Sequence, residues 1–395
     1  MLKDLFKHSG IYFFGSILSK GLSVLVFILF ARTLLPQRFG YFVLFVTLLQ
    51  VITFFSDFGL NQWYQKRTDE ESEDILFSKI INARLLTLLV SLFFSLLFLK
   101  LTNSFSPLIS TILLLTLIPE AFLSVVDGYY LVLKKPFRVS MKISVRMAIL
   151  FVGYLLFSKG FSLNHAISLY LIASCLTLLW YFPWKKLKHL TLQFEGIFST
   201  LRNSFAYAFL ILTSFAYARG DSLVIGYVLN STALGIYGAA YRYLESLSLI
   251  PTALSQNLFP VSAQKKGITS EQLLKIVSVT FLAGIVFMIL TFFFSNFLIV
   301  TLLGKSYIAA VPILRIFSVV LLLFFLNSPL ATVVQSSKLV ERFLPFGALN
   351  TIVNIVLNLC FVPFFGITAA AYVMLTTEIT GLIINLYFIK KLYSF

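Results

Sequence analysis

Four basic side chains of this 395-residue sequence lie inside long apolar segments, where a charge is costly. They are Lys20, Arg219, Arg242 and Arg315. A charge at the centre of a membrane helix costs roughly 2.5–3.5 kcal/mol, so each of these residues should face a water-filled cavity or an acidic partner. Because ammonium and guanidinium groups bind phosphate, the four bases are candidate ligands for an anionic substrate.

Carboxylates occur at similar depth, and two kinds of chemistry are open to them. They can pair with the bases, as Glu245 can with Arg242 three residues earlier on one helix. They can also carry a proton or coordinate sodium as a coupling ion. Arg219 and Asp221 are two residues apart and point to different faces, which favours partners on other helices. The candidates for a coupling ion or an ion pair are Glu120, Asp127, Asp221, Glu245 and Glu378.

The composition predicts that these residues lie in a polytopic membrane protein. Hydrophobic residues make up 59% of the chain and charged residues 12%, about half the charged fraction of a soluble domain. The formal net charge of +16 would favour nucleic-acid binding in a soluble protein, but here the loops are too short to form a basic face. Neither Cys175 nor Cys360 belongs to a metal-binding or disulfide pattern, so we expect no metal and no cofactor.

Apolar runs of about 20 residues, the length that crosses a bilayer as a helix, recur along the whole chain. We therefore predict an all-α fold with twelve transmembrane helices. Their expected limits are 9–31, 40–62, 81–101, 106–133, 139–158, 163–184, 203–229, 233–262, 275–298, 308–335, 343–363 and 367–389.

The basic residues outside these runs predict the topology. Most of the 31 Lys and Arg residues fall in alternate gaps, including Lys142 and Arg146 in the gap before the fifth helix, so both termini are expected in the cytoplasm. A long polar gap near residue 190 divides the chain into two six-helix lobes, 1–190 and 191–395. Since six is even, an internal repeat must be parallel. Phe39-Gly40-Tyr41-Phe42 and Leu234-Gly235-Ile236-Tyr237, which open helices 2 and 8, are candidate equivalents.

Several short motifs, in order along nearly the whole chain, resemble those of polysaccharide flippases. These are the O-antigen and capsule-unit exporters of the multidrug/oligosaccharidyl-lipid/polysaccharide superfamily. The first hairpin carries Ala31-Arg32-Thr33-Leu34-Leu35-Pro36-Gln37-Arg38-Phe39-Gly40 and then Asp57-Phe58-Gly59-Leu60. Later motifs are Asp221 through Tyr237, Phe259-Pro260, Leu303-Gly304-Lys305-Ser306-Tyr307, Pro312-Ile313-Leu314-Arg315-Ile316, and Asn350, Asn354 and Asn358 before Gly366-Ile367-Thr368-Ala369-Ala370-Ala371.

The resemblance implies a V-shaped transporter like the multidrug exporters of the superfamily, which moves a lipid-linked oligosaccharide by alternating access. The expected partners are this glycan, membrane lipids, H⁺ or Na⁺ as coupling ion, and the enzymes of polysaccharide assembly. The expected location is the bacterial cytoplasmic membrane. Lys20 would then hold the substrate's pyrophosphate, or alternatively form a buried ion pair with an acid such as Glu120.

Two other functions compete with this prediction. An ion-coupled multidrug antiporter of the same superfamily would select cations with acidic groups, whereas the deep charges here include four bases. A membrane polysaccharide polymerase or glycosyltransferase would need a catalytic carboxylate on a sizeable external loop, and the predicted outer loops are short. We therefore expect a transporter and not an enzyme.

Overall fold

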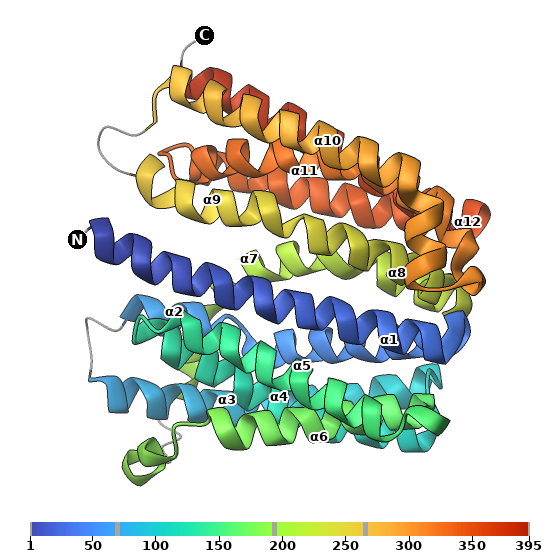
Figure 1. Ribbon diagram of the computed structural model, residues 1–395. Coiled ribbons are helices and arrows are strands. Elements are labelled where there is room, and N and C mark those ends of the chain that lie inside the picture. The colour runs from blue at the N-terminus through green and yellow to red at the C-terminus, as the bar shows by residue number, and fades with distance from the viewer. Residues whose placement is uncertain (1, 68–71, 192–195, 264–267, 394–395) are drawn as a thin grey trace. The chain divides into compact units, whose positions relative to one another are not determined.

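A computed structural model describes residues 2–67, 72–191, 196–263 and 268–393 of the chain (Figure 1). Within these residues every regular element is a helix, which confirms the predicted all-α class. The helices are α1 (Leu2–Asp57), α2 (Leu60–Arg67), α3 (Glu73–Thr102), α4 (Pro107–Val132), α5 (Pro136–Leu156), η1 (Ser158–Gly160), α6 (Leu163–Tyr181), η2 (Trp184–His189), α7 (Ile197–Val224), η3 (Ile225–Leu229), α8 (Ser231–Leu247), α9 (Leu249–Ser262), α10 (Ser270–Leu302), η4 (Lys305–Ala310), α11 (Val311–Gln335) and α12 (Val340–Tyr393).

The described helices supply the length and apolar character that membrane crossing requires. Eight of them are long and apolar enough to span a bilayer, or nine when the bent α7 with η3 is counted as one span. Both α1 and α12 contain two of the predicted membrane segments, and α8 with α9 forms another. Counted in this way, the described residues contain the twelve predicted segments.

Breaks in the long helices lie where the sequence weakens helical geometry. Leu35 in α1 has φ 61° and ψ 166°, directly before Pro36, whose ring disfavours a helical conformation of the preceding residue. Gly366 in α12 has φ 66°, which glycine adopts without strain. Both residues lie in predicted gaps between helices. The predicted second helix, 40–62, is wrong in one respect, because the positive φ of Phe58 and Gly59 separates α1 from α2.

The chain divides into two units by its internal contacts. Unit 1 comprises Met1–Thr33 and Phe45–Phe215, and unit 2 comprises Leu34–Leu44 and Ala216–Phe395. In unit 1, α4 packs against α2, α3, α5 and α6, while in unit 2 α11 packs against α8, α9, α10 and α12. The first two thirds of α7, up to Phe215, thus belong to unit 1, and the lobe boundary between residues 190 and 191 stays a prediction.

Two glycines give unit 2 a close contact between helix starts. A Cβ atom added to Gly40 would lie 1.7 Å from the carbonyl oxygen of Ser231, and one added to Gly235 would lie 2.0 Å from that of Pro36. Each glycine therefore faces the carbonyl one helical turn before the other glycine. A reciprocal contact of this kind arises when two segments are related by a two-fold axis. It joins the two similar sequences that open the predicted second and eighth membrane segments.

The polar segment after α6 is fixed to the start of α3. The ammonium of Lys186 in η2 lies 2.7 Å from Glu73 Oε1 and 2.5 Å from Asp74 Oδ1. Burial lowers the pKa of Lys186, but the hydrogen bonds with Asp74 and Glu73 outweigh it, so the net effect is a raised pKa. Lys186 therefore stays charged at physiological pH, and its ion pairs with Glu73 and Asp74 hold η2 in place.

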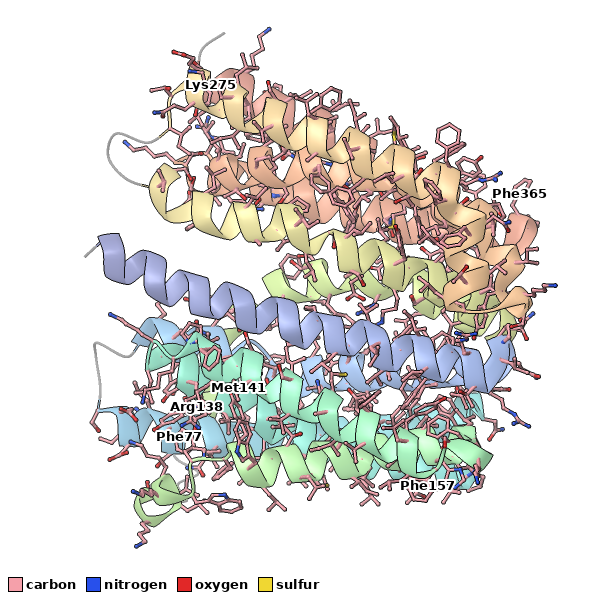
Figure 2. All side chains as sticks on the ribbon, in the orientation of Figure 1. Phe77, Arg138, Met141, Phe157, Lys275 and Phe365 are labelled. Carbon is pink, nitrogen blue, oxygen red and sulfur yellow. The ribbon has the colours of Figure 1, made fainter. Side chains whose placement is uncertain are left out.

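Large apolar side chains cover the outward faces of the helices, as contact with lipid requires. Phe93 and Phe94 of α3 are mostly exposed, as is Phe293 of α10. Figure 2 labels two more exposed aromatic residues, Phe157 after α5 and Phe365 beside the break in α12. The surface thus repeats the apolar composition that the sequence shows as a whole.

The glycine contact yields a stability prediction. Gly40→Ala should lower the free energy of unfolding by about 1–3 kcal/mol or more, because the new methyl group would overlap a backbone carbonyl. Thermal unfolding of the purified protein in detergent measures this. Gly347→Ala is the matched control in α12, where nothing lies within 4 Å of an added Cβ, so better helix propensity should leave the protein equally or more stable. Equal melting temperatures for the two variants would contradict the packing role of Gly40.

Candidate functional site

Two ion pairs join α4 to α5 in unit 1. Glu120 and Asp127 are seven residues apart, two helical turns, so they share a face of α4. Lys142 and Arg146 are one turn apart on α5. Arg146 Nη1 lies 2.5 Å from Glu120 Oε1, and Lys142 donates to Asp127. The earlier acid thus pairs with the later base and the later acid with the earlier base, although the acids are spaced more widely than the bases.

Neutral donors complete these two pairs. Ser174 of α6 donates to Glu120 Oε1 at 2.6 Å, and the hydroxyl of Tyr181 donates to Asp127 Oδ1 at 3.1 Å. Each carboxylate therefore has a basic partner and an additional hydrogen bond, which is the condition for burying charge without a large penalty. This geometry assigns Glu120 and Asp127 to ion pairs that hold α4, α5 and α6 together.

A third ion pair lies at the end of α1, within the predicted second membrane segment. Arg84 of α3, whose side chain is fully buried, donates to Asp57, the last residue of α1. Ser124 of α4 also donates to Asp57 Oδ1, at 3.2 Å. Asp57 thus ties α1, α3 and α4 together.

The assignment of Lys142 and Arg146 to the cytoplasmic gap before helix 5 was wrong. Both lie within α5, and Lys142 is only 8% exposed. Their carboxylate partners on α4 allow them to lie inside the bundle. The sequence contained a signal for this, since both positions fall within the helix predicted at 139–158.

Lys20 differs from the other deep bases of unit 1. It is half-buried and lies in α1, within the first predicted membrane segment. Among the residues that the structure describes, Lys20 makes no hydrogen bond or ion pair. The expected alternative, a pair with Glu120, does not form because Glu120 is bound by Arg146. Within the described part of the chain, the ammonium group of Lys20 thus has no counter-charge.

Unit 2 holds a cluster in which two guanidinium groups share one carboxylate. Arg219 Nη2 of α7 lies 3.2 Å from Glu245 Oε1, and Arg242 Nη1 lies 2.8 Å from Glu245 Oε2. Arg219 also lies over the ring of Tyr241, with its guanidinium carbon 5.6 Å from the ring centroid. The pairing of Arg242 with Glu245 and the partner of Arg219 on another helix are both as expected.

The other two candidate acids of unit 2 accept hydrogen bonds from neutral groups. Asp221 accepts from the hydroxyl of Tyr237 and, at 2.6 Å, from the backbone N–H of Ser222. In the described part of the chain, Asp221 forms no ion pair with a base, and Arg219 is bound by Glu245 instead. Asp221 is thus a buried carboxylate whose described hydrogen-bond partners are neutral donors.

Glu378 has a similar environment on α12. It accepts from the hydroxyl of Tyr217 and from Asn327 Nδ2 at 2.8 Å. No base pairs with Glu378 within the described ranges. Asn385 Nδ2 in turn donates to Asn327 Oδ1 at 3.1 Å. The sequence analysis did not include Asn327 and Asn385, although an amide inside an apolar helix is itself a signal of an interhelical hydrogen bond.

Arg315 lies apart from the arginine cluster of unit 2. Its Nε donates to Ser295 Oγ of α10 at 3.1 Å, and its guanidinium lies 5.6 Å from the ring centroid of Phe292. The side chain is exposed, about one turn from the start of α11. The structure thus brings together two of the four predicted bases, Arg219 and Arg242. No metal-binding group of His, Cys, Asp and Glu side chains occurs among the residues searched, which are those that the structure describes.

Sequence comparison gives relatives of the whole chain. The family model described as "Polysaccharide biosynthesis protein" matches residues 5–266. A protein of Haloferax volcanii named "Probable low-salt glycan biosynthesis flippase Agl15" is 23% identical over 406 residues, covering 99% of this chain and 84% of that protein. "Probable flippase AglR" of the same organism is 26% identical over 186 residues, covering 44% of this chain and 38% of that protein.

Solved structures share the fold. The inward closed conformation of the lipid II flippase MurJ has a TM-score of 0.83 at 18% identity, covering 96% of this chain and 87% of that chain. An inward-facing multidrug resistance transporter of the MATE family has a TM-score of 0.70 at 12% identity, covering 95% of each chain. The fold of this multi-pass membrane protein is therefore that of the superfamily that its motifs indicate. On the match over residues 5–266, the chain belongs to the polysaccharide biosynthesis protein family.

Proposed function

We propose that this protein is a flippase that moves a polyprenyl-diphosphate-linked oligosaccharide from the cytoplasmic to the outer leaflet. The observation that carries the proposal is Lys20, an ammonium group in a membrane segment with no partner among the described residues. A diphosphate is a suitable ligand for such a group because it supplies the missing counter-charge. The relatives named as flippases of glycan biosynthesis support the same substrate class.

The mechanism that we propose is alternating access through a cationic cavity. Lys20 of unit 1 binds the diphosphate, and Arg219 and Arg242 of unit 2 are the further phosphate ligands that we propose, while the lipid tail stays in the bilayer. The exposed Arg315 contacts the substrate near the end of α11 that is predicted to lie on the outer side. No covalent bond is made or broken, so the protein acts as a transporter and not as an enzyme.

Coupling to an ion is assigned within this proposal to Glu378. Glu120 and Asp127 are bound by Arg146 and Lys142, whereas Glu378 accepts only from Tyr217 and Asn327 among the described side chains. A carboxylate without a basic partner can take up H⁺ or Na⁺, and the bound cation replaces the missing counter-charge. Asp221, bound by Tyr237, is the second candidate.

The location and partners complete the proposal. Both termini lie in the cytoplasm and the protein contacts the enzymes of polysaccharide assembly, in a bacterial cytoplasmic membrane. The curated relatives come from an archaeon, so they support a membrane protein of glycan biosynthesis without indicating which cell envelope it serves.

The role of Lys20 can be tested by measuring flipping in vesicles that contain the purified protein and a fluorescent polyprenyl-diphosphate oligosaccharide. Lys20→Ala should lower the initial flipping rate at least about tenfold, because a hydrogen bond to a charged group contributes roughly 1.5–3 kcal/mol. Lys20→Arg should keep most of the rate because it keeps the charge.

The control for this experiment is Lys275→Ala, which removes an exposed ammonium at the start of α10 whose partner is Glu271 (Figure 2). Normal flipping by Lys20→Ala would contradict the proposed diphosphate site. Transport of a cationic dye, without movement of the lipid, would instead favour the multidrug antiporter.

A second prediction separates structural charges from charges that bind substrate. Arg146→Met should lower the free energy of unfolding by about 3–5 kcal/mol, because it leaves Glu120 buried without its partner. Adding Glu120→Gln should restore much of that loss, since the uncompensated charge is removed. Thermal unfolding of the single and double variants measures both effects. A double variant no more stable than Arg146→Met would show that the pair is not what stabilises α4 against α5.

A third prediction concerns coupling. Glu378→Gln keeps the size of the side chain and its acceptor oxygen but cannot take up a proton or offer a charge to sodium. Flipping by this variant should therefore no longer respond to an imposed H⁺ or Na⁺ gradient, while the wild type responds to one of them. Arg146→Met is the control for loss of stability: it should lower the flipping rate through unfolding but keep the response to the gradient. A gradient response that survives in Glu378→Gln would move the coupling role to another acid.

A further inference from the structure

An open groove lies in unit 2 between α9 and α11, apart from the arginine cluster. Its volume is about 520 Å³, within the range of sites that bind small molecules. No charged side chain is among its lining residues, and most of them carry a hydroxyl or an amide. The polar and aromatic lining residues are Thr252, Ser255, Phe259, Ser328, Thr332 and Gln335.

The protons of the groove's hydroxyl groups are already used inside the protein. Thr252 and Thr332 each donate to the backbone carbonyl one helical turn earlier, at 2.7 and 2.8 Å. Ser328 donates to the carbonyl of Pro251 at 3.1 Å. The Oγ atoms of Ser255 and Ser328 are 2.5 Å apart, and because Ser328 has one proton, Ser255 is the donor between them. The four hydroxyl groups therefore present oxygen lone pairs as their remaining hydrogen-bonding capacity.

A surface of acceptors selects its ligand by chemistry. Sugar hydroxyl groups can donate to these oxygens, whereas phosphate and carboxylate groups have no proton to donate and would face acceptors without a counter-charge. Gln335, which is exposed at the end of α11, adds an amide that both donates and accepts. Phe259 is 46% exposed and offers an aromatic face of the kind that packs on a sugar ring.

The groove lies toward the predicted cytoplasmic ends of its helices. α9 ends at Ser262 and α11 at Gln335, and the sequence beyond each contains basic residues typical of cytoplasmic loops, such as Lys338 and Arg342. The break at Ser248, before Pro251, begins α9 as a separate helix. A glycan headgroup that enters from the cytoplasm would therefore reach the groove before transport.

We propose that this groove binds neutral sugar residues of the transported glycan, separately from the cationic groups that bind its diphosphate. The inference rests on the proposed function and adds a specificity to it: the protein prefers a glycan with uncharged hexose units to one with uronic acids.

The test compares two substrates in vesicles that contain the full-length protein. One is a polyprenyl diphosphate bearing a neutral hexose trisaccharide, and the other bears a trisaccharide with a uronic acid. The wild type should flip the neutral substrate roughly tenfold faster at low substrate concentration, as expected from one or two hydrogen bonds lost and a carboxylate facing acceptors.

The variants then assign that preference to the groove. Thr332→Val combined with Gln335→Leu should lower flipping of the neutral substrate roughly tenfold and leave the acidic substrate unchanged. Gln335→Arg should raise flipping of the acidic substrate, because a guanidinium pairs with its carboxylate. Thr376→Val is the matched control, since Thr376 makes the same bond to the preceding turn, at 2.9 Å, on α12 outside the groove.

The outcomes separate the two proposals. If the wild type flips neither lipid, the proposed function is wrong and the groove inference fails with it. If the wild type flips both lipids at equal rates, or the double variant keeps the neutral rate with an unchanged melting temperature, the flippase proposal stands and the groove inference is overturned. A defect in Thr376→Val as large as that of the double variant would also overturn it.

Discussion

The cost of placing a charge inside a membrane bundle governs where the polar residues of this chain lie. In unit 1 the described carboxylates Asp57, Glu120 and Asp127 each have one basic partner, and each pair joins different helices. Breaking such a pair costs more than forming it gains, so the pairs act chiefly as constraints on which helices lie side by side. Against this background Lys20, which has no hydrogen-bond or ion-pair partner among the described residues, is the base that we propose as a ligand of the diphosphate.

Unit 2 meets the same constraint by different means. Glu245 is shared by Arg219 and Arg242, while Asp221 and Glu378 accept hydrogen bonds from tyrosine and amide groups. A carboxylate stabilised by neutral donors can change its protonation or its bound ion without losing a salt bridge. The described carboxylates of the two units thus differ: those of the unit 1 bundle have basic partners, whereas Asp221 and Glu378 of unit 2 are bound by neutral donors.

The uncharged groove of unit 2 adds a third kind of polar surface. Thr252, Ser328 and Thr332 donate their protons to backbone carbonyls and Ser255 donates to Ser328, which leaves hydrogen-bond acceptors along the groove. Such side chains cost little in an apolar bundle, yet they can distinguish a neutral sugar from an anion. A substrate with a charged diphosphate and a polar glycan requires both kinds of surface, because no single one can bind both parts well.

The sequence by itself determined the all-α membrane class and the succession of segments, because these depend on the length and hydropathy of local runs. It also determined the gaps that contain the breaks at Leu35 and Gly366, because proline and glycine act locally on the backbone. Similar local patterns also marked Gly40 and Gly235 as equivalent positions. Only the tertiary structure decided which charges are paired between different helices. Lys142 and Arg146 fall within a helix predicted from the sequence, but their partners, Asp127 and Glu120, lie 15 and 26 residues away on another helix. Pairing is a property of distance in space, which the order of residues along one helix does not specify.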